Sequence, residues 1–178
     1  MSIGYLFKGD LGSGVVVIGA PDLESTYETP LCAIESPYGA PKGLTGKARA
    51  ARFRRNIFYA RLLVNRVIHE GHAWLASHLQ YTQPRVLDDD DPGDRELGIR
   101  LGLAANERAD YSLFGTDLGW STGMRYGLAH AREHGRPTYR INLFSPDLDL
   151  EDATYEELVE LAKDYGLITN QRDPRPGW

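Results

Sequence analysis

The sequence predicts an α/β fold in which a parallel β-sheet is covered by helices on both faces. From residue 31 onward, short apolar runs alternate with longer stretches of helical periodicity. Repeats of strand, helix and strand form parallel sheets, because each crossover helix returns the chain to the same edge. A length of 178 residues and a hydrophobic content of 42% are typical of one globular domain with a substantial core.

The first 30 residues are expected to form a β-hairpin extension. Residues 3–19 contain two apolar runs on either side of a short stretch rich in glycine, which is typical of a turn. The apolar surface of such a ribbon is expected to pack on the core or on another chain. We therefore divide the chain into a hairpin extension (1–30), an α/β domain (31–143), and a C-terminal helix and tail of the same domain (144–178).

The elements of the α/β domain follow from periodicity and from signals at helix ends. Pro92 and the acids before it favour the start of a helix, and Gly71 ends the preceding one. Thr154 and Glu157 form a capping box. The predicted order is a strand over 31–34, a helix over 48–69, a strand over 73–77, a helix over 92–108, a strand over 111–115, a helix opened by 119–131, a strand over 137–144 and a helix over 154–165.

Polar residues that follow the strands are the candidates for a binding site. Ligands of parallel sheets bind beyond the carboxyl ends of the strands. The sequence places three groups at this edge: Glu35, Ser36, Pro37 and Tyr38 after the first strand, Ser77 and His78 after the second, and 115–117 after the third. Asp110 precedes the third strand and falls on the opposite edge, so we expect it to be structural.

Composition excludes several classes of protein. The net charge of −5 argues against a general nucleic-acid partner, although Lys47–Arg55 is a basic segment. No apolar run approaches the roughly 20 residues that span a bilayer, and no signal peptide is recognisable. We expect a soluble, cytoplasmic protein without a membrane partner. Cys32 is the only cysteine and has apolar neighbours, so it is expected to be buried and structural.

The histidines and clustered acids are not expected to hold a metal ion. His69 and His72 flank a glycine at a helix end, whereas paired zinc ligands on a helix need a spacing of four residues. His130 and His134 are expected to face solvent on a helix. Residues 88–91 are four consecutive aspartates before Pro92. They are expected to favour the positive end of a helix, with chelation of a divalent ion as the alternative.

Five motifs stand out along the chain: ESPYG, NIFYARLLVNRVIHEGHAWLASHLQY, LDDDDPGDRELGIRLGL, ADYSLFG and STGMRYGLAHAREHGRPTY. They occur in the order and spacing found in nucleoside 2-deoxyribosyltransferase-like proteins, including a phage and bacterial branch, and they cover about 31–143. The resemblance implies a flavodoxin-like parallel sheet, cleavage of an N-glycosidic bond in a nucleoside or nucleotide, no cofactor, and a homodimer or larger oligomer.

The resemblance also indicates a missing acid. In enzymes of this superfamily, a glutamate four residues after the glycine of the last turn attacks the anomeric carbon. Counting from Gly123, that position is Gly127, which has no side chain. A carboxylate is needed because the transition state resembles an oxocarbenium ion. Ser121 and Thr122 stand where the superfamily carries a second, sugar-orienting acid.

The turn before Gly127 still has the features of an anion site. Backbone N–H groups at a helix start and nearby hydroxyls bind phosphate, and related nucleotide N-hydrolases use a serine at this position. The residues concerned are Ser121, Thr122, Gly123, Met124 and Arg125. The alternative is that Ser121 or Thr122 simply caps the helix.

Two acids are candidates to replace the missing glutamate. Glu35, which ends the first strand at the ligand edge, is the first candidate, and Asp117, on a loop after the third strand, is the second. The alternatives are that Glu35 pairs with a neighbouring arginine or accepts N–H bonds of the turn, and that Asp117 is solvated. With Ser36, Pro37, Tyr38, Asn56 and His78, the two acids outline a site for a nucleotide or nucleoside. The first hypothesis is an enzyme that uses a displaced carboxylate. The second is a catalytically inactive protein that senses or sequesters a nucleotide, and the third is an interaction role for the N-terminal hairpin.

Overall fold

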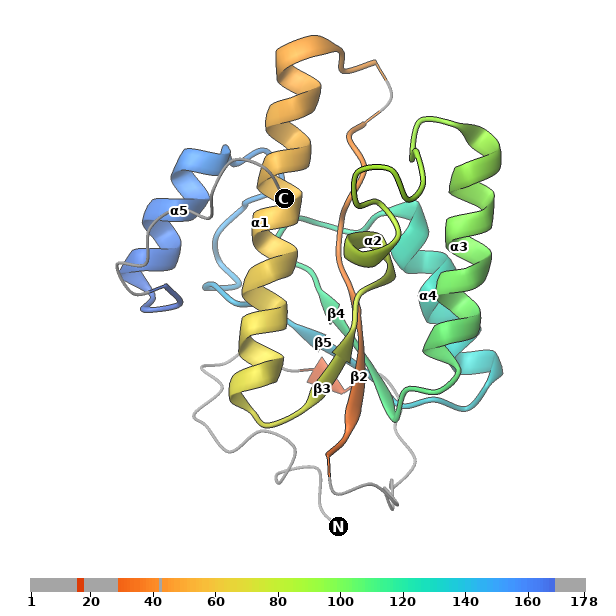
Figure 1. The fold of residues 1–178 in the computed structure, drawn as a ribbon. Helices are drawn as coiled ribbons and strands as arrows, with labels where there is room; N and C mark the ends of the chain where they lie inside the picture. Colours follow the sequence, from red (N-terminus) through yellow and green to blue (C-terminus); the bar gives the residue numbers. More distant parts are fainter. Residues whose placement is uncertain (1–15, 18–28, 42, 169–178) are drawn as a thin grey trace.

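A computed structural model describes residues 16–17, 29–41 and 43–168 (Figure 1). Within this part of the chain, a single sheet has the strand order β1-β5-β4-β2-β3. The pairs β2–β3, β2–β4 and β4–β5 are parallel, whereas β1 is antiparallel to β5. The strands are β1 (Val16–Val17), β2 (Leu31–Glu35), β3 (Ala73–Leu75), β4 (Tyr111–Gly115) and β5 (Thr138–Ile141).

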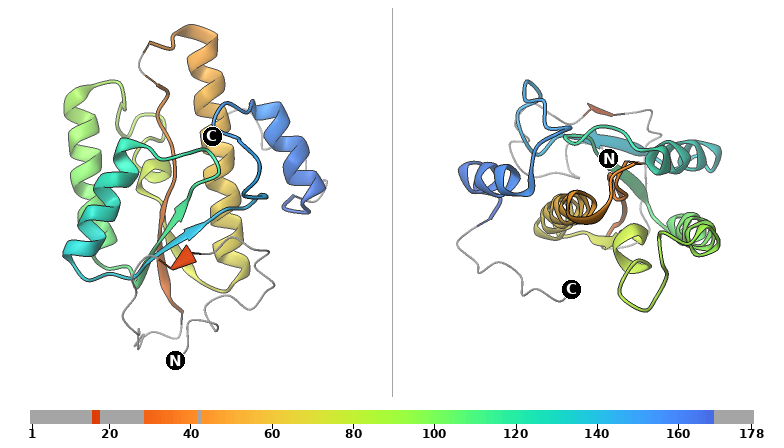
Figure 2. Two further views of the ribbon diagram at one scale, coloured as in Figure 1. Left: turned by 180° about the vertical axis from the view of Figure 1, so that it is seen from behind. Right: turned by 90° about the horizontal axis from the view of Figure 1, so that it is seen from above.

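Helices cover both faces of the sheet, as the sequence predicts. In the two views of Figure 2, α1 and α5 lie on one face, and α3 and α4 lie on the other. The chain runs from β2 outward to β3 and then back past β2 to β4 and β5, so right-handed crossovers place the later helices on the opposite face. The resulting order β3-β2-β4-β5 is that of a flavodoxin-like sheet. The helices are α1 (Gly46–His69), α2 (Ser77–Gln80), α3 (Pro92–Asn106), α4 (Thr122–Glu133) and α5 (Tyr155–Asp164).

The predicted elements agree with the observed ones except in two places. β3 ends at Leu75, and Ser77 begins the short helix α2, where the sequence predicted the end of a strand and a loop. The helix is a single turn that buries Leu79, and one turn is too short to produce a recognisable period. β5 is also shorter than the predicted strand over 137–144.

The core lies between the sheet and α1. All five residues of β4 are buried, and Ala60, Leu63, Val64 and Val67 of α1 pack on this side at helical spacing. Cys32 is a free, fully buried cysteine, which confirms the prediction that it is structural.

Side-chain caps define the helix starts that position the site. The Asp91 carboxylate accepts hydrogen bonds from the N–H groups of Gly93 and Asp94, each at 2.9 Å, which confirms the predicted start at Pro92. The reciprocal bonds of Thr154 and Glu157 confirm the predicted capping box of α5. At the other edge of the sheet, the Asp110 carboxylate accepts from the Leu31 N–H at 2.7 Å, so its predicted structural role is also confirmed.

The predicted N-terminal hairpin lies largely outside the described residues. Its described part is β1, whose Val16 and Val17 are in register with Arg140 and Tyr139 of β5. Residues 169–178 of the predicted tail also lie outside. Among the helices that the structure describes, none has the length and apolar character needed to cross a bilayer.

Candidate functional site

A cleft of about 800 Å³ opens at the carboxyl ends of the central strands. Its lining combines the end of β2 with residues of α1, α2 and α3 and the first turn of α4. From β2 the chain proceeds to β3 on one side, while β4 lies on the other side, so the cleft lies where the strand order reverses. This is the usual ligand position in open parallel sheets.

Most of the predicted site residues are brought together in this cleft. Asp117 and Arg125 are not among its lining residues, and Arg125 is exposed on α4. The predicted residues that line it are Glu35, Ser36, Pro37, Tyr38, Asn56, His78, Ser121, Thr122, Gly123 and Met124.

The Asp117 carboxylate has a structural role. It accepts a hydrogen bond from the Tyr59 hydroxyl at 2.5 Å and from the backbone N–H groups of Leu143 and Phe144 at 2.9 and 3.0 Å. Asp117 is 8% exposed, and its bonds tie the end of β4 to α1 and to the segment after β5. A carboxylate with three donors outside the cleft is not positioned to act on a ligand, so we do not retain Asp117 as a catalytic candidate.

The Glu35 carboxylate lies against Gly127 of α4. A Cβ atom built on Gly127 would lie 2.8 Å from Glu35 Oε1 and 2.9 Å from Glu35 Cδ. Carbon and oxygen atoms do not approach this closely unless one of them moves. The Glu35 side chain can therefore occupy its position only because residue 127 has no side chain. The end of β2 therefore delivers a carboxylate to the part of α4 that lines the cleft, where α4 itself has no acidic residue.

Polar partners from distant parts of the chain hold Glu35 in place. Asn106, at the end of α3, donates a hydrogen bond from Nδ2 to Glu35 Oε1 at 3.0 Å. Burial raises the pKa of Glu35 to about 7, and the positive charge of Arg136 and the Asn106 bond offset part of this effect. A carboxyl group with this pKa exists in both protonation states near neutral pH, which suits acid–base chemistry.

His78 and Asn56 shape the wall of the cleft opposite α4. His78 Nε2 lies 3.0 Å from Ser36 Oγ, and burial lowers the pKa of His78 to about 4, so the ring is neutral at physiological pH. The Asn56 amide donates to the backbone oxygen of Tyr38 at 2.8 Å and accepts from the buried guanidinium of Arg55. Asn56 therefore fixes the turn after β2 on α1, and its amide is occupied by these bonds.

The start of α4 retains the features of an anion site. Ser121 Oγ accepts from the Met124 N–H at 3.2 Å, which makes Ser121 the helix cap, the alternative that the sequence left open. Helix geometry leaves the N–H groups of Thr122 and Gly123 without intrahelical acceptors. Because these residues line the cleft, two N–H groups at the positive end of α4 remain suited to an anion.

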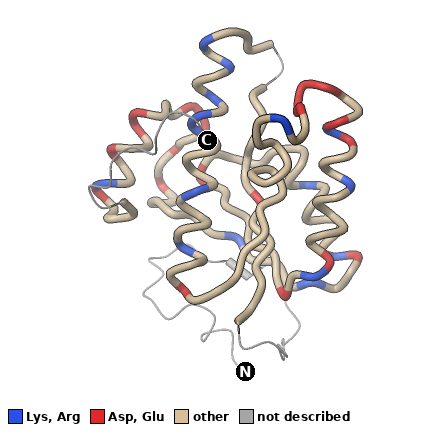
Figure 3. The backbone as a smooth tube through the Cα atoms, in the orientation of Figure 1, with Lys and Arg blue, Asp and Glu red and all other residues tan. Residues whose placement is uncertain are grey.

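Aromatic and basic residues that the sequence analysis did not select also line the cleft. Trp120 stacks on Phe114 with ring centroids 5.5 Å apart and presents an indole surface next to α4. Arg49 and Arg52 of α1 form ion pairs with Asp90 and Asp152. Figure 3 shows the acidic loop before α3 facing the basic first turns of α1. These ion pairs connect α1 to loops on either side of the cleft.

The four consecutive aspartates are engaged with the protein itself. Asp91 caps α3, Asp89 pairs with Arg95 at 2.6 Å, and Asp90 pairs with Arg49. Asp88 Oδ1 accepts from the Asp90 N–H at 3.0 Å. This arrangement agrees with the predicted charged loop at a helix start rather than with a chelating one.

Comparison with known proteins assigns the chain to a family. Residues 30–141 match a family described as a domain of unknown function, DUF7768. The chain belongs to this family. The DUF7768 match runs from the residue before β2 to the last residue of β5, and it contains every residue that lines the cleft except Glu151. No curated protein and no solved structure matches the chain.

Two residues of the DUF7768 domain that influence the position and the pKa of Glu35 were not predicted from the sequence. Asn106 is 71 positions away from Glu35, and Arg136 lies just before β5. The Arg136 guanidinium is held by Ser112 Oγ and by the backbone oxygen of Asn106. Asn106 lies outside the five motifs, and Arg136 lies inside the last of them without any pattern that links it to Glu35. Only the packing of α3 and α4 on the sheet brings both residues to Glu35.

The raised pKa of Glu35 predicts a pH-dependent contribution to stability. The pKa of about 7 in the folded protein exceeds the ordinary value of 4.5, so the contribution is complete below pH 4.5 and is lost as the pH rises through 7. It amounts to at most about 3 kcal/mol in the free energy of unfolding. The lowered pKa of His78 makes the protein more stable as the pH rises, which is the opposite effect. The quantity to measure is therefore the difference in free energy of unfolding between the native protein and Glu35→Gln.

Urea denaturation of both proteins between pH 5 and pH 8 tests this expectation. The native protein should lose free energy of unfolding relative to Glu35→Gln across this interval. A constant difference between the two proteins would show that the pKa of Glu35 in the folded protein lies below pH 5.

Proposed function

We propose that the cleft binds a nucleoside or nucleotide and that Glu35 acts on its N-glycosidic bond. The observation that carries this proposal is the contact between the Glu35 carboxylate and Gly127. The resemblance to nucleoside 2-deoxyribosyltransferase-like proteins implies a catalytic glutamate at this position of α4. Glu35 brings a carboxylate to the same place from β2, so the reacting group is supplied by a different element of the fold.

Cleavage requires a carboxylate and a way for the base to leave. In the proposed reaction, a Glu35 oxygen bonds to the anomeric carbon while the bond from that carbon to the base nitrogen breaks and its electron pair departs with the base. The departing base takes up a proton from solvent or from a neighbouring group. Water then hydrolyses the glycosyl ester, or a second base takes the sugar and regenerates the carboxylate.

The surroundings of Glu35 offer contacts for both ends of a nucleotide. The N–H groups at the start of α4 are suited to a 5′-phosphate, and Ser121 retains a hydroxyl proton to donate while its oxygen caps the helix. The indole surface of Trp120 and the neutral ring of His78 are suited to stacking and hydrogen bonding with a base. The proposed binding surface consists of these cleft residues and does not include Arg125 or Asp117.

A non-catalytic nucleotide-binding protein is the second candidate. The hydrogen bond from Asn106 and the nearby charge of Arg136 would also suit a buried carboxylate that serves only to hold α3 and α4 on the sheet. In that case, the protein would sense or sequester its ligand. The expected homodimer or larger oligomer remains a prediction, since the N-terminal hairpin on which it rests lies largely outside the described residues.

Incubation with nucleosides and their 5′-monophosphates tests the proposal. The purified protein is expected to release free base, detected by chromatography, and to show a higher melting temperature with the ligand that it binds, because a ligand specific for the folded state stabilises that state. A rise in melting temperature without base release would favour the binding protein. Neither effect with any ribo- or deoxyribonucleotide would contradict both functions.

A further inference from the structure

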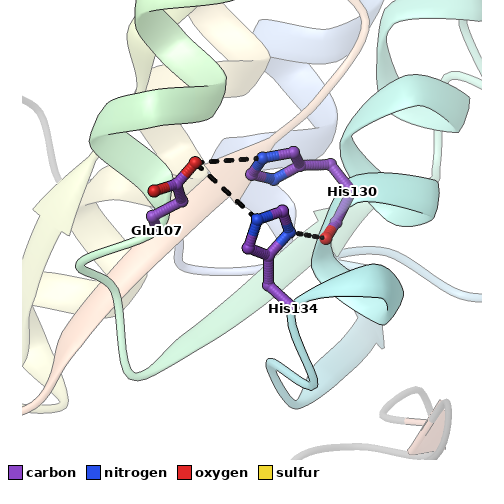
Figure 4. Close-up of side chains that lie close together, drawn as sticks. All are labelled: Glu107, His130 and His134. Carbon is purple, nitrogen blue, oxygen red and sulfur yellow. Dashed lines mark hydrogen bonds and ion pairs between the residues drawn. The ribbon is translucent and has the colours of Figure 1, made fainter.

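A second group of polar residues lies at the edge of the sheet opposite the cleft. Glu107 follows α3 and precedes β4, whereas His130 and His134 lie at the end of α4 just before β5. Figure 4 shows the two imidazole rings and the carboxylate turned toward one another across the gap between the helices. Their potential ligand atoms all lie within 4.8 Å of one another.

The spacing of these atoms is that of metal ligands rather than of hydrogen bonds. His130 Nε2 and His134 Nε2 lie 3.5 and 3.8 Å from the same oxygen, Glu107 Oε1. N–H···O hydrogen bonds are usually about 2.7–3.2 Å long. Ligands at about 2.0–2.1 Å from a tetrahedral zinc ion are separated from each other by about 3.4 Å. An ion between the three atoms would therefore require little movement.

The orientation of the rings makes both Nε2 atoms available. His134 Nδ1 lies 2.9 Å from the backbone oxygen of His130, so Nδ1 carries the proton and Nε2 has a free lone pair in the neutral ring. The His130 side chain is 15% exposed, contrary to the expectation that it faces solvent. Its Nδ1 is buried without a hydrogen-bond partner in the part of the chain that the structure describes.

Electrostatics also favour a cation at this position. Glu107 and His134 are the C-terminal caps of α3 and α4, so the negative ends of two helix dipoles meet here. Glu107 and His130 also line a surface groove whose other lining residues belong to α3.

From this geometry we infer that Glu107, His130 and His134 form a binding site for a divalent transition-metal ion of the zinc class. Two imidazoles and a carboxylate are a ligand set typical of zinc with an open fourth position for water, whereas magnesium and calcium prefer oxygen ligands. The ion would link the ends of α3 and α4. The site is separate from the proposed nucleotide site and does not depend on it.

Zinc titration of the untagged, chelator-treated full-length protein tests the inference. Isothermal titration with zinc chloride is expected to show one saturable site per chain, and zinc should raise the melting temperature. Glu107→Gln and His134→Gln should each weaken zinc affinity by more than about tenfold. Both side chains are substantially exposed, at 49% and 42%, so these variants should fold.

His69→Gln is the matched control, because it removes an exposed histidine at the end of α1, on the other face of the sheet. It should bind zinc as the native protein does. Absence of a saturable site, or unchanged zinc affinity in both ligand variants, would overturn the inference.

Discussion

Replacing Glu35 with glutamine is expected to reduce base release by at least about 100-fold, because a neutral amide cannot replace the carboxylate as the nucleophile, and the loss of a positioned acid or base alone already costs a factor of this size. Glutamine has nearly the same shape, and its oxygen can still accept the bond from Asn106 Nδ2. Nucleotide binding should therefore persist, with a ligand-induced rise in melting temperature close to that of the native protein. Chromatography of the released base and thermal denaturation with and without nucleotide give the two measurements.

The matched control is Glu133→Gln, which removes an exposed carboxylate from α4 outside the cleft. It should release base at the native rate. Undiminished release by Glu35→Gln would eliminate Glu35 as the reacting group. Loss of both release and nucleotide binding would indicate instead that Glu35 maintains the shape of the cleft.

Gly127→Ala is expected to lower base release by at least about tenfold without removing any polar group, because a misplaced reacting group loses much of its effect. The new methyl carbon would lie 2.8 Å from Glu35 Oε1, so the carboxylate must move away from α4. Alanine also favours the helix by about 1 kcal/mol relative to glycine, which offsets part of the steric cost. A fall in activity with little change in the free energy of unfolding is therefore the expected result, measured by base release and urea denaturation.

Gly123→Ala provides the comparison for stability. It adds the same methyl group to the first turn of α4, where the nearest atom to the new methyl carbon would be Ser121 Oγ at 3.8 Å. This variant should gain stability without displacing Glu35. Native activity in Gly127→Ala would mean that the contact between Glu35 and α4 has no part in the reaction.

Local patterns in the sequence determined the elements and the edge at which the site lies. The alternation of strands and helices, the cap at Asp91 and the capping box at Thr154 are encoded within a few residues, so they could be predicted without knowledge of packing. The same patterns placed Glu35 and His78 at the carboxyl ends of strands. They could not reveal α2, because one helical turn has no recognisable period.

Only the tertiary structure decided which acid faces the cleft. Glu35 and Asp117 both follow strands at the same edge, and the sequence favoured Glu35 only because it ends a strand there. Packing turns Asp117 toward the Tyr59 hydroxyl and two backbone N–H groups, whereas Glu35 lies over Gly127 beside Asn106. These contacts join segments that are far apart in the chain, and the side-chain directions depend on how α1, α3 and α4 pack on the sheet.

The group at the opposite edge illustrates the same limit. The spacing of four residues between His130 and His134 was visible in the sequence, but an i, i+4 pair on a helix is equally compatible with a solvated surface. The third member, Glu107, belongs to another helix and is 23 or more positions away. Glu107 lies near the two histidines only because α3 and α4 pack side by side on the same face of the sheet. The sequence does not show which helices are neighbours in this way.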